Sequence, residues 1–282
     1  MRSRPLSSIW VAIVLGLLSP AVAAQPAGTA PPATTQPAVS PPALDPEVDK
    51  ILTRLEQRKV KDLRARLAWQ LRYVTDAPED STIKRGEIWY QDTKPVARFF
   101  IRFTEKIAAG RKDRLDERHL FDGQWYVTLN SRTKTVERNE VRKPNDKRDP
   151  YKIGKGMFPL PFGQKKADIL REFKVEKIAP GADEPENTDH IRLIPRAQTQ
   201  TGQRYRRLDF WVSREGKTAG LPVMVQVAKL DGTGKVNSYI TVSFADARLN
   251  EGVSGSIFAI KTPAGYDESK NPLKPVPPPR AP

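Results

Sequence analysis

Residues 63–73 read LRARLAWQLRY and alternate apolar with mostly polar side chains at a period of two. Leucine, alanine, tryptophan and tyrosine occupy the odd positions, while arginine, glutamine and one alanine occupy the even positions. Successive side chains of a strand point to opposite faces of a sheet. The stretch therefore predicts a long strand with one apolar and one basic face.

The same period recurs along the chain. Asp122-Gly123 lies between HLF and QWYVTL, and DGTG follows at residues 231–234; both are hairpin signals. We expect about ten strands, linked mostly as antiparallel hairpins, in a mainly β domain with flanking α-helices. A sheet this wide with a long apolar face must curl and be covered. The further predicted strands are 83–90, 96–103, 124–129, 134–141, 173–178, 190–194, 205–213, 223–230 and 236–244.

Two helices are predicted to provide that cover. Residues 46–58 follow Asp45, a good N-cap, and begin with Pro46, which suits the first helical position. One face of this helix is apolar at the spacing of an amphipathic helix, so we expect it to act as a lid. The lid residues are Val48, Ile51, Leu52 and Leu55. A second, shorter helix is predicted at residues 164–172.

The first 24 residues have the pattern of an export signal. Arg2 and Arg4 precede an apolar run at residues 9–18, and small residues place the cleavage site near Ala23 and Ala24. The run is shorter than the about 20 apolar residues that span a bilayer. We therefore expect a periplasmic or otherwise exported envelope protein, with an uncleaved anchor as the alternative.

Composition changes beyond this signal and again near the other end. Residues 25–44 form a Pro/Ala-rich linker and residues 268–282 a Pro-rich tail, and both are predicted to be disordered. The remaining residues, 45–267, are expected to form one domain with a substantial core.

The charge and the cysteine content limit the partners and the reactive sites that the protein can have. There are 48 Lys and Arg against 33 Asp and Glu, a formal net charge of +15, and no cysteine. Such a surface attracts acidic lipids, anionic glycans or nucleic acid, and export argues against nucleic acid as a partner. The lack of cysteine excludes thiol nucleophiles and thiolate metal sites.

Candidate catalytic or metal-binding groups are few. Glu117 and His119 share one face of a strand, but two ligands from one strand do not make a metal site, so we interpret them as a solvated polar stretch. Asp122 and Asp231 are expected to form turns. The chain contains no nucleophile elbow, phosphate loop or HExxH motif. We expect no enzymatic activity, no cofactor and no bound metal.

Five short motifs in order give a family resemblance. They are GEIWY at 86–90, PVARF at 95–99, DGQW at 122–125, LIPR at 193–196, and a closing F-x-I-x-x-P-x-G-x-D at 258–267. Together they resemble the LolA/LolB-like outer-membrane lipoprotein carriers over residues 47–267. The resemblance implies a strongly curved, unclosed antiparallel β-barrel covered or plugged by helices, a periplasmic location and an apolar cavity for acyl chains, without catalysis. The basic first strand and a long basic loop at 143–161 depart from that pattern.

The predicted cavity is lined by the apolar faces of the strands. The residues are Leu67, Trp69, Leu71, Phe99, Ile101, Phe103, Phe210, Val212, Val225, Val227, Val242 and Phe244. The alternative is that these side chains pack against the helices as an ordinary core. An acyl chain of about 15 methylenes gains up to roughly 12 kcal/mol on leaving water, so shape and apolar area suffice for binding.

Two functions fit these expectations. The first is a non-enzymatic carrier or receptor for lipid or lipoprotein acyl chains, whose further partners would be an inner-membrane transporter or an outer-membrane receptor. The alternative is an envelope module of the same fold whose basic surface binds an anionic membrane surface, a glycan or an acidic protein.

A charge on the apolar face tests the cavity. Ile101→Glu is expected to lower both the binding of a fluorescent hydrophobic probe and the free energy of unfolding, because a carboxylate is costly in an apolar site. Probe titration and urea unfolding measure the two effects. Unchanged values of both would show that Ile101 does not line a cavity.

Overall fold

The computed structural model describes residues 44–74, 81–153 and 162–273. The predicted signal peptide, all but the last residue of the predicted linker, and the tail from residue 274 lie outside the described residues. Within the described part of the chain, no helix is both long and apolar enough to cross a membrane.

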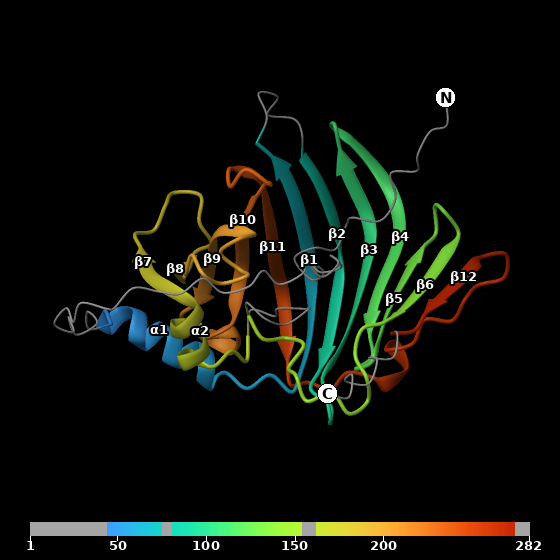
Figure 1. The fold of residues 1–282 in the computed structure, drawn as a ribbon, viewed down its shortest axis with the longest axis horizontal. Coiled ribbons are helices and arrows are strands. Elements are labelled where there is room, and N and C mark those ends of the chain that lie inside the picture. Colours follow the sequence, from blue (N-terminus) through green and yellow to red (C-terminus); the bar gives the residue numbers. More distant parts are fainter. Residues whose placement is uncertain (1–43, 75–80, 154–161, 274–282) are drawn as a thin grey trace, which may run out of the picture.

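One sheet of twelve strands dominates the described residues (Figure 1). It is strongly curved and does not close, which confirms the predicted fold class. Its order is β12-β6-β5-β4-β3-β2-β1-β11-β10-β9-β8-β7. The strands are β1 (Asp62–Tyr73), β2 (Ser81–Gln91), β3 (Arg98–Ala108), β4 (Arg111–Phe121), β5 (Trp125–Asn130), β6 (Thr135–Glu140), β7 (Phe173–Ile178), β8 (Thr188–Pro195), β9 (Tyr205–Ser213), β10 (Pro222–Leu230), β11 (Val236–Leu249) and β12 (Asp267–Asn271).

The order shows two meanders joined along one line. Strands β1 to β6 form one antiparallel meander and β7 to β11 form the other, and β1 pairs with β11 between them. Leu67 lies opposite Phe244, and Trp69 lies opposite Val242, in this antiparallel pair. Because the pairing sets these side chains on the same face, the apolar stripe of the quoted stretch continues from one meander into the other.

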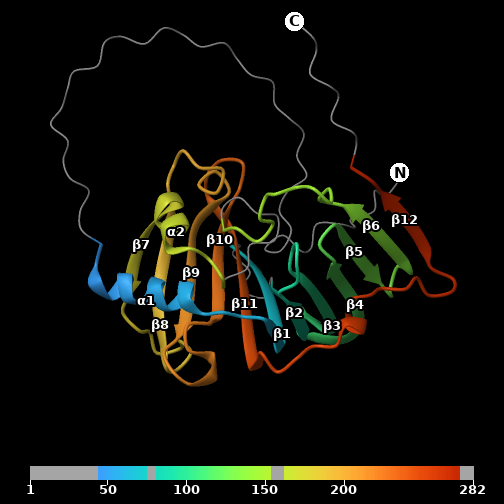
Figure 2. The same cartoon turned by 90° about the horizontal axis from the view of Figure 1, so that it is seen from below.

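Two α-helices, α1 (Pro46–Gln57) and α2 (Lys166–Glu172), cover part of the concave face. The Asp45 side chain accepts a hydrogen bond of 2.8 Å from the Glu47 backbone N–H, which caps α1 as predicted. All four apolar residues of the α1 stripe are buried. They pack with α2 against β7 to β10, on one side of the concave face (Figure 2).

The convex face of β2 to β6 is also apolar in its centre. Trp89, Phe100, Leu120 and their neighbours form a cluster that the segment 253–266 covers through Phe258 and Ile260. This segment carries the chain across to the far edge, where β12 pairs in parallel with β6. Strands β2 to β5 thus bury apolar side chains on both faces.

The structure corrects three sequence expectations. The two strands beyond the predicted ten are β4, inside the sheet, and β12, at its edge. The strands number twelve rather than about ten, and the β12–β6 pair is parallel. Residues 268–271, assigned to the Pro-rich tail, belong to β12, because their backbone continues the ladder with β6. All five side chains of β12 are exposed, so no hydrophobic alternation marked this strand.

Gly86 of β2 lies against the backbone of β3 with no room for a side chain. A Cβ atom at this position would lie 1.9 Å from the Arg102 carbonyl oxygen. The β2–β3 register shifts at this point, between Arg85 and Gly86. The contact is with backbone, so a side chain is accommodated only if the strands move apart.

We expect Gly86→Ala to lower the free energy of unfolding by about 3 kcal/mol or more, because overpacking against backbone cannot relax by a rotamer change. Chemical unfolding measures the loss. Gly232→Ala is the matched control, since a Cβ there meets nothing within 4 Å. Equal stability of the two variants would contradict the close approach.

Candidate functional site: an apolar concave face with a buried ionic row

The twelve predicted lining residues all lie on the concave face, and the structure divides them into two clusters. Eleven are buried and Phe244 is half-buried. The helix-covered cluster contains Phe210, Val212, Val225 and Val227. The central cluster contains Leu67, Trp69, Leu71, Phe99, Ile101, Phe103 and Val242, with Phe244 packed against it.

The helix-covered cluster is filled by the protein itself. Its four predicted lining residues pack in one cluster with Val48, Ile51, Leu52 and Leu55 of α1. Ile169 of α2 and Phe173 of β7 complete this packing. The predicted lid helix therefore covers the β7–β10 half, and the four strand residues beneath it form a conventional helix-on-sheet core.

The central cluster has a different cover. Tyr151 and Phe162, from the segment between β6 and α2, and Leu221 belong to this cluster. The Tyr151 ring makes edge-on contacts with Tyr90 and Phe121, and its hydroxyl donates a hydrogen bond of 2.6 Å to the Ala97 carbonyl oxygen. Among the described residues, no helix lies over this half of the face (Figure 2).

Two hollows of the described surface lie elsewhere. One, of about 300 Å³, is lined by Ser81, Ile83 and the β3–β4 turn; the other, of about 360 Å³, lies on the convex side around Trp89 and Arg248. None of the twelve predicted lining residues lines either hollow. The predicted cavity thus remains a prediction for the central cluster.

A row of polar side chains crosses the central cluster. We call Lys84 of β2, Glu117 and His119 of β4, and Tyr126 of β5 the ionic row. Lys84 Nζ lies 2.8 and 2.7 Å from the two Glu117 carboxylate oxygens. His119 Nε2 lies 2.7 Å from Glu117 Oε1, and His119 Nδ1 lies 2.6 Å from the Tyr126 hydroxyl oxygen. All four residues are less than 9% exposed.

The surroundings fix the protonation of the row. Burial raises the pKa of Glu117, but hydrogen bonds and charge from His119 and Lys84 outweigh burial and lower that pKa to about 2. Burial lowers the pKa of His119 and raises that of Tyr126. At neutral pH the carboxylate is ionised and accepts from His119 Nε2–H, so Nδ1 accepts from the Tyr126 hydroxyl. The row then carries one positive and one negative charge.

The interpretation of Glu117 and His119 as a solvated polar stretch was wrong. Both side chains are buried, because Lys84 supplies the countercharge from β2, on the other side of β3. A signal was present in the sequence: Glu117 and His119 alternate in phase with Phe121, which is fully buried on the same face. Lys84 likewise alternates in phase with the buried Ile88. Only the strand order, however, shows that Lys84 and Glu117 meet across β3.

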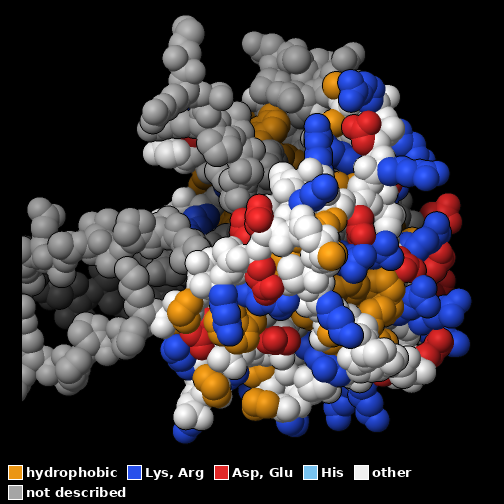
Figure 3. Space-filling view, turned by 90° about the vertical axis from the view of Figure 1, so that its right-hand side faces the viewer, with side chains coloured by type: hydrophobic (Ala, Val, Ile, Leu, Met, Phe, Trp, Pro, Cys, Tyr) orange, Lys and Arg blue, Asp and Glu red, His pale blue; other side chains and the backbone are white. Residues whose placement is uncertain are grey.

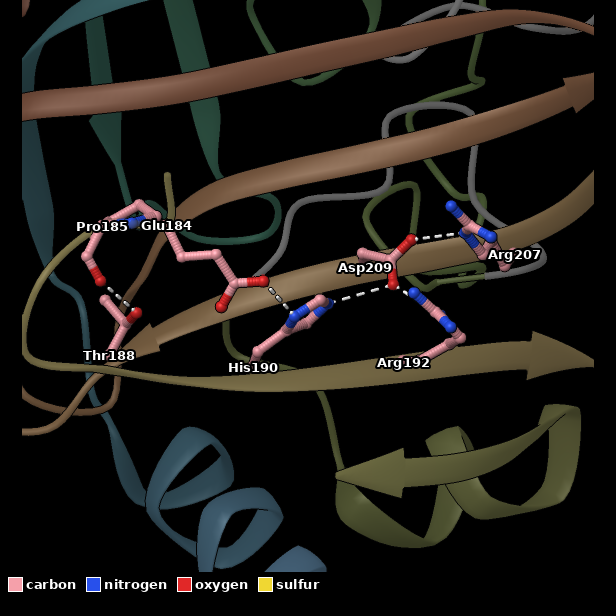
Figure 4. A network of polar contacts seen from close by, with 7 residues as sticks. All are labelled: Glu184, Pro185, Thr188, His190, Arg192, Arg207 and Asp209. Carbon is pink, nitrogen blue, oxygen red and sulfur yellow. Dashed lines mark hydrogen bonds and ion pairs between the residues drawn. The ribbon is translucent and has the colours of Figure 1, made fainter. Parts of the chain in front are cut away.

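A second polar network lies on the opposite face of β8 and β9 (Figure 4). The Asp209 carboxylate contacts His190 Nε2 at 3.0 Å, Arg192 Nε at 2.7 Å and Arg207 Nε at 2.8 Å. Glu184 contacts the other nitrogen of His190 at 2.7 Å. Asp209 is 1% exposed, so these partners compensate a buried charge and account for the network structurally.

The polar groups do not form a recognisable cofactor or metal site. Among the described residues, no three His, Asp or Glu side chains are placed to hold one metal ion. Asp122 and Asp231 act as turn formers, as predicted: Asp122 Oδ1 accepts from the backbone N–H of Trp125 at 2.7 Å, and Asp231 Oδ1 from that of Thr233 at 2.8 Å.

No protein-family model matches the chain, and no curated protein matches it significantly. Solved structures are similar to it at low identity. An uncharacterised conserved protein from Thermus thermophilus is 8% identical, covering 80% of this chain and 99% of its own, with a TM-score of 0.43. The domain of an outer-membrane lipoprotein-sorting protein from Vibrio parahaemolyticus, described as putative, is 10% identical, covering 75% and 94%, with a TM-score of 0.36.

A LolA superfamily protein from Nitrosomonas europaea is also similar, at 10% identity, covering 75% of this chain and 97% of its own, with a TM-score of 0.36. The solved structures similar to this chain thus include members of the superfamily that its motifs resemble. Likeness at this level carries no information on ligand or partner, and the fold class rests on the strand order and curvature of the chain itself.

Acid should weaken the fold through the ionic row. The folded-state pKa of Glu117, about 2, lies below the ordinary value of 4.5 for a glutamate, so its contribution to stability is present above pH 4.5 and is lost as the pH falls toward 2. That difference corresponds to about 3 kcal/mol at neutral pH. We expect Glu117→Gln to lose most of this pH dependence in unfolding experiments between pH 6 and pH 3, roughly the range where a carboxylate titrates.

The control for this experiment is Glu87→Gln, which makes the same charge change on the convex face, where Glu87 pairs with Arg64 at 2.9 Å. This variant should keep the wild-type pH dependence, because the pair is largely solvated. A wild-type pH profile in Glu117→Gln would show that the row does not couple to folding.

Proposed function

We propose that the protein is a non-enzymatic carrier or receptor that binds an acyl chain on the central cluster in the cell envelope. The observation that carries this proposal is the unequal cover of the concave face: α1 and α2 pack on the β7–β10 half, whereas the apolar faces of β1, β3 and β11 have no described helix above them. An acyl chain inserted over these strands would be held by apolar area alone.

The energetics favour this use. An acyl chain gains about 0.8 kcal/mol for each methylene that leaves water, so a row of aromatic and aliphatic side chains along three strands is sufficient. Tyr151 and Phe162, which contact one end of this cluster, belong to a connecting segment rather than to the sheet. The export signal predicted at the start of the chain supports an envelope location for this binding.

Lipid extraction tests the proposal directly. The protein is purified without detergent, and its organic extract is analysed by mass spectrometry for acyl lipids in stoichiometric amount. An extract without lipid, together with no binding of a fluorescent fatty-acyl probe by the native protein, would refute the carrier function.

Filling the central cluster should separate binding from stability. Leu67→Trp is expected to lower acyl-probe affinity by about tenfold, with less than about 1 kcal/mol lost in unfolding, because a larger side chain takes the place of the ligand. The matched variant Val227→Trp overpacks the helix-covered cluster and should cost about 1–3 kcal/mol while leaving probe affinity unchanged. Comparable stability losses in both variants would show that the central cluster is as tightly packed as the other.

The alternative function is an envelope module whose basic surface binds anionic lipid, glycan or an acidic protein. The excess of 48 basic over 33 acidic residues favours it. On the side of the molecule that carries β12, however, Asp and Glu side chains lie among the Lys and Arg side chains (Figure 3). This module predicts binding to anionic vesicles that weakens strongly with salt, whereas binding of a buried acyl chain is insensitive to salt.

A further inference from the structure

The ionic row lies among the residues proposed to contact the acyl chain. Lys84 is the register partner of Trp69, and its Nζ lies 5.8 Å from the Trp69 ring and 5.6 Å from the Phe103 ring. His119 lies opposite Ile101 in the β3–β4 pair. The His119 ring also meets the Phe103 ring edge-on at 5.8 Å. A chain lying along these side chains would bring part of the bound molecule against Lys84 and Glu117.

The row is electrically balanced without a ligand. Among the described residues, the Glu117 carboxylate is the one acceptor recorded for Lys84, and it uses two donors of the ammonium group. The third donor has no recorded acceptor there and faces aromatic rings. A ligand group beside Lys84 would also lie close to Glu117. An anionic head would therefore meet the carboxylate at short range, in surroundings that screen charge poorly.

The Lys84–Glu117 pair can accommodate an uncharged polar group of a ligand. An ester or amide carbonyl can take the remaining Lys84 donor, and a hydroxyl can in addition donate to Glu117 Oε2. These contacts leave no charge uncompensated. The pair is also poorly explained by stability alone, since a buried ion pair often contributes no more than apolar side chains of the same volume.

We propose that the ionic row receives the polar end of the bound lipid and selects acyl lipids with an uncharged ester, amide or hydroxyl head over fatty-acid anions. This inference rests on the proposed acyl-chain function and adds the chemical class of the ligand. Lys84 and Glu117 act together as the selecting pair, and His119 and Tyr126 orient the carboxylate.

The test compares a monoacylglycerol with the fatty acid of the same chain length, by calorimetric titration of the full-length protein at pH 8. The wild type is expected to bind the monoacylglycerol about tenfold more tightly, and Glu117→Gln to shift the ratio of the two affinities by about tenfold or more toward the fatty acid, because Lys84 is then uncompensated. Glu87→Gln, with the same charge change on the convex face, should retain the wild-type ratio.

A double variant covers the case in which Glu117→Gln does not fold. Lys84→Met with Glu117→Met replaces the pair by apolar side chains, which buried sites often tolerate, and should bind both lipids with a ratio near one. A wild-type ratio in this folded variant would overturn the assignment of the row. If the wild type bound both lipids with equal affinity and Glu117→Gln did not change this, the proposed selection would be refuted, whereas acyl-chain binding would still be supported. Binding of neither lipid would refute both this inference and the proposed function.

Discussion

The antiparallel pairing of β1 with β11 is the interaction on which the rest of the structure depends. It is the single seam between the two meanders, and it places residues 63–73 opposite residues 238–249. Through this seam the apolar stripe of β1 continues into β11, and the concave face becomes one surface with two differently covered halves. Without it, each meander would expose one apolar face and an unpaired edge.

The seam also explains why the two halves differ. In the chain, α1 precedes and α2 follows the first meander. Both helices nevertheless pack on strands of the second meander, at the end of the sheet opposite to β6 and β12. The central cluster, built largely on the first meander, instead includes Tyr151, Phe162 and Leu221. The helix-covered cluster and the central cluster thus share one continuous sheet.

Local alternation made most of the fold predictable. The stretch at residues 63–73 gave β1 almost to the residue, and Asp45 with the apolar stripe gave α1, because both signals lie within a few consecutive side chains. The division of the predicted lining residues was not predictable. Phe210 and Phe99 have the same local pattern, and only the strand order shows that one lies under α1 and the other beside Tyr151. The ionic row was missed for a related reason, since Lys84 and Glu117 are brought together by two register choices across β3 that no local pattern encodes.

The chain segment from β11 to β12 has a consequence for the order of assembly. It completes the seam with β1, then crosses the convex face through Phe258 and Ile260, and finally adds the parallel edge at β6. The first meander can therefore bury neither its free edge nor its convex apolar centre until the last quarter of the chain is present. Contacts of such large sequence separation slow folding, so the first meander should complete its packing only when synthesis of the chain is nearly finished.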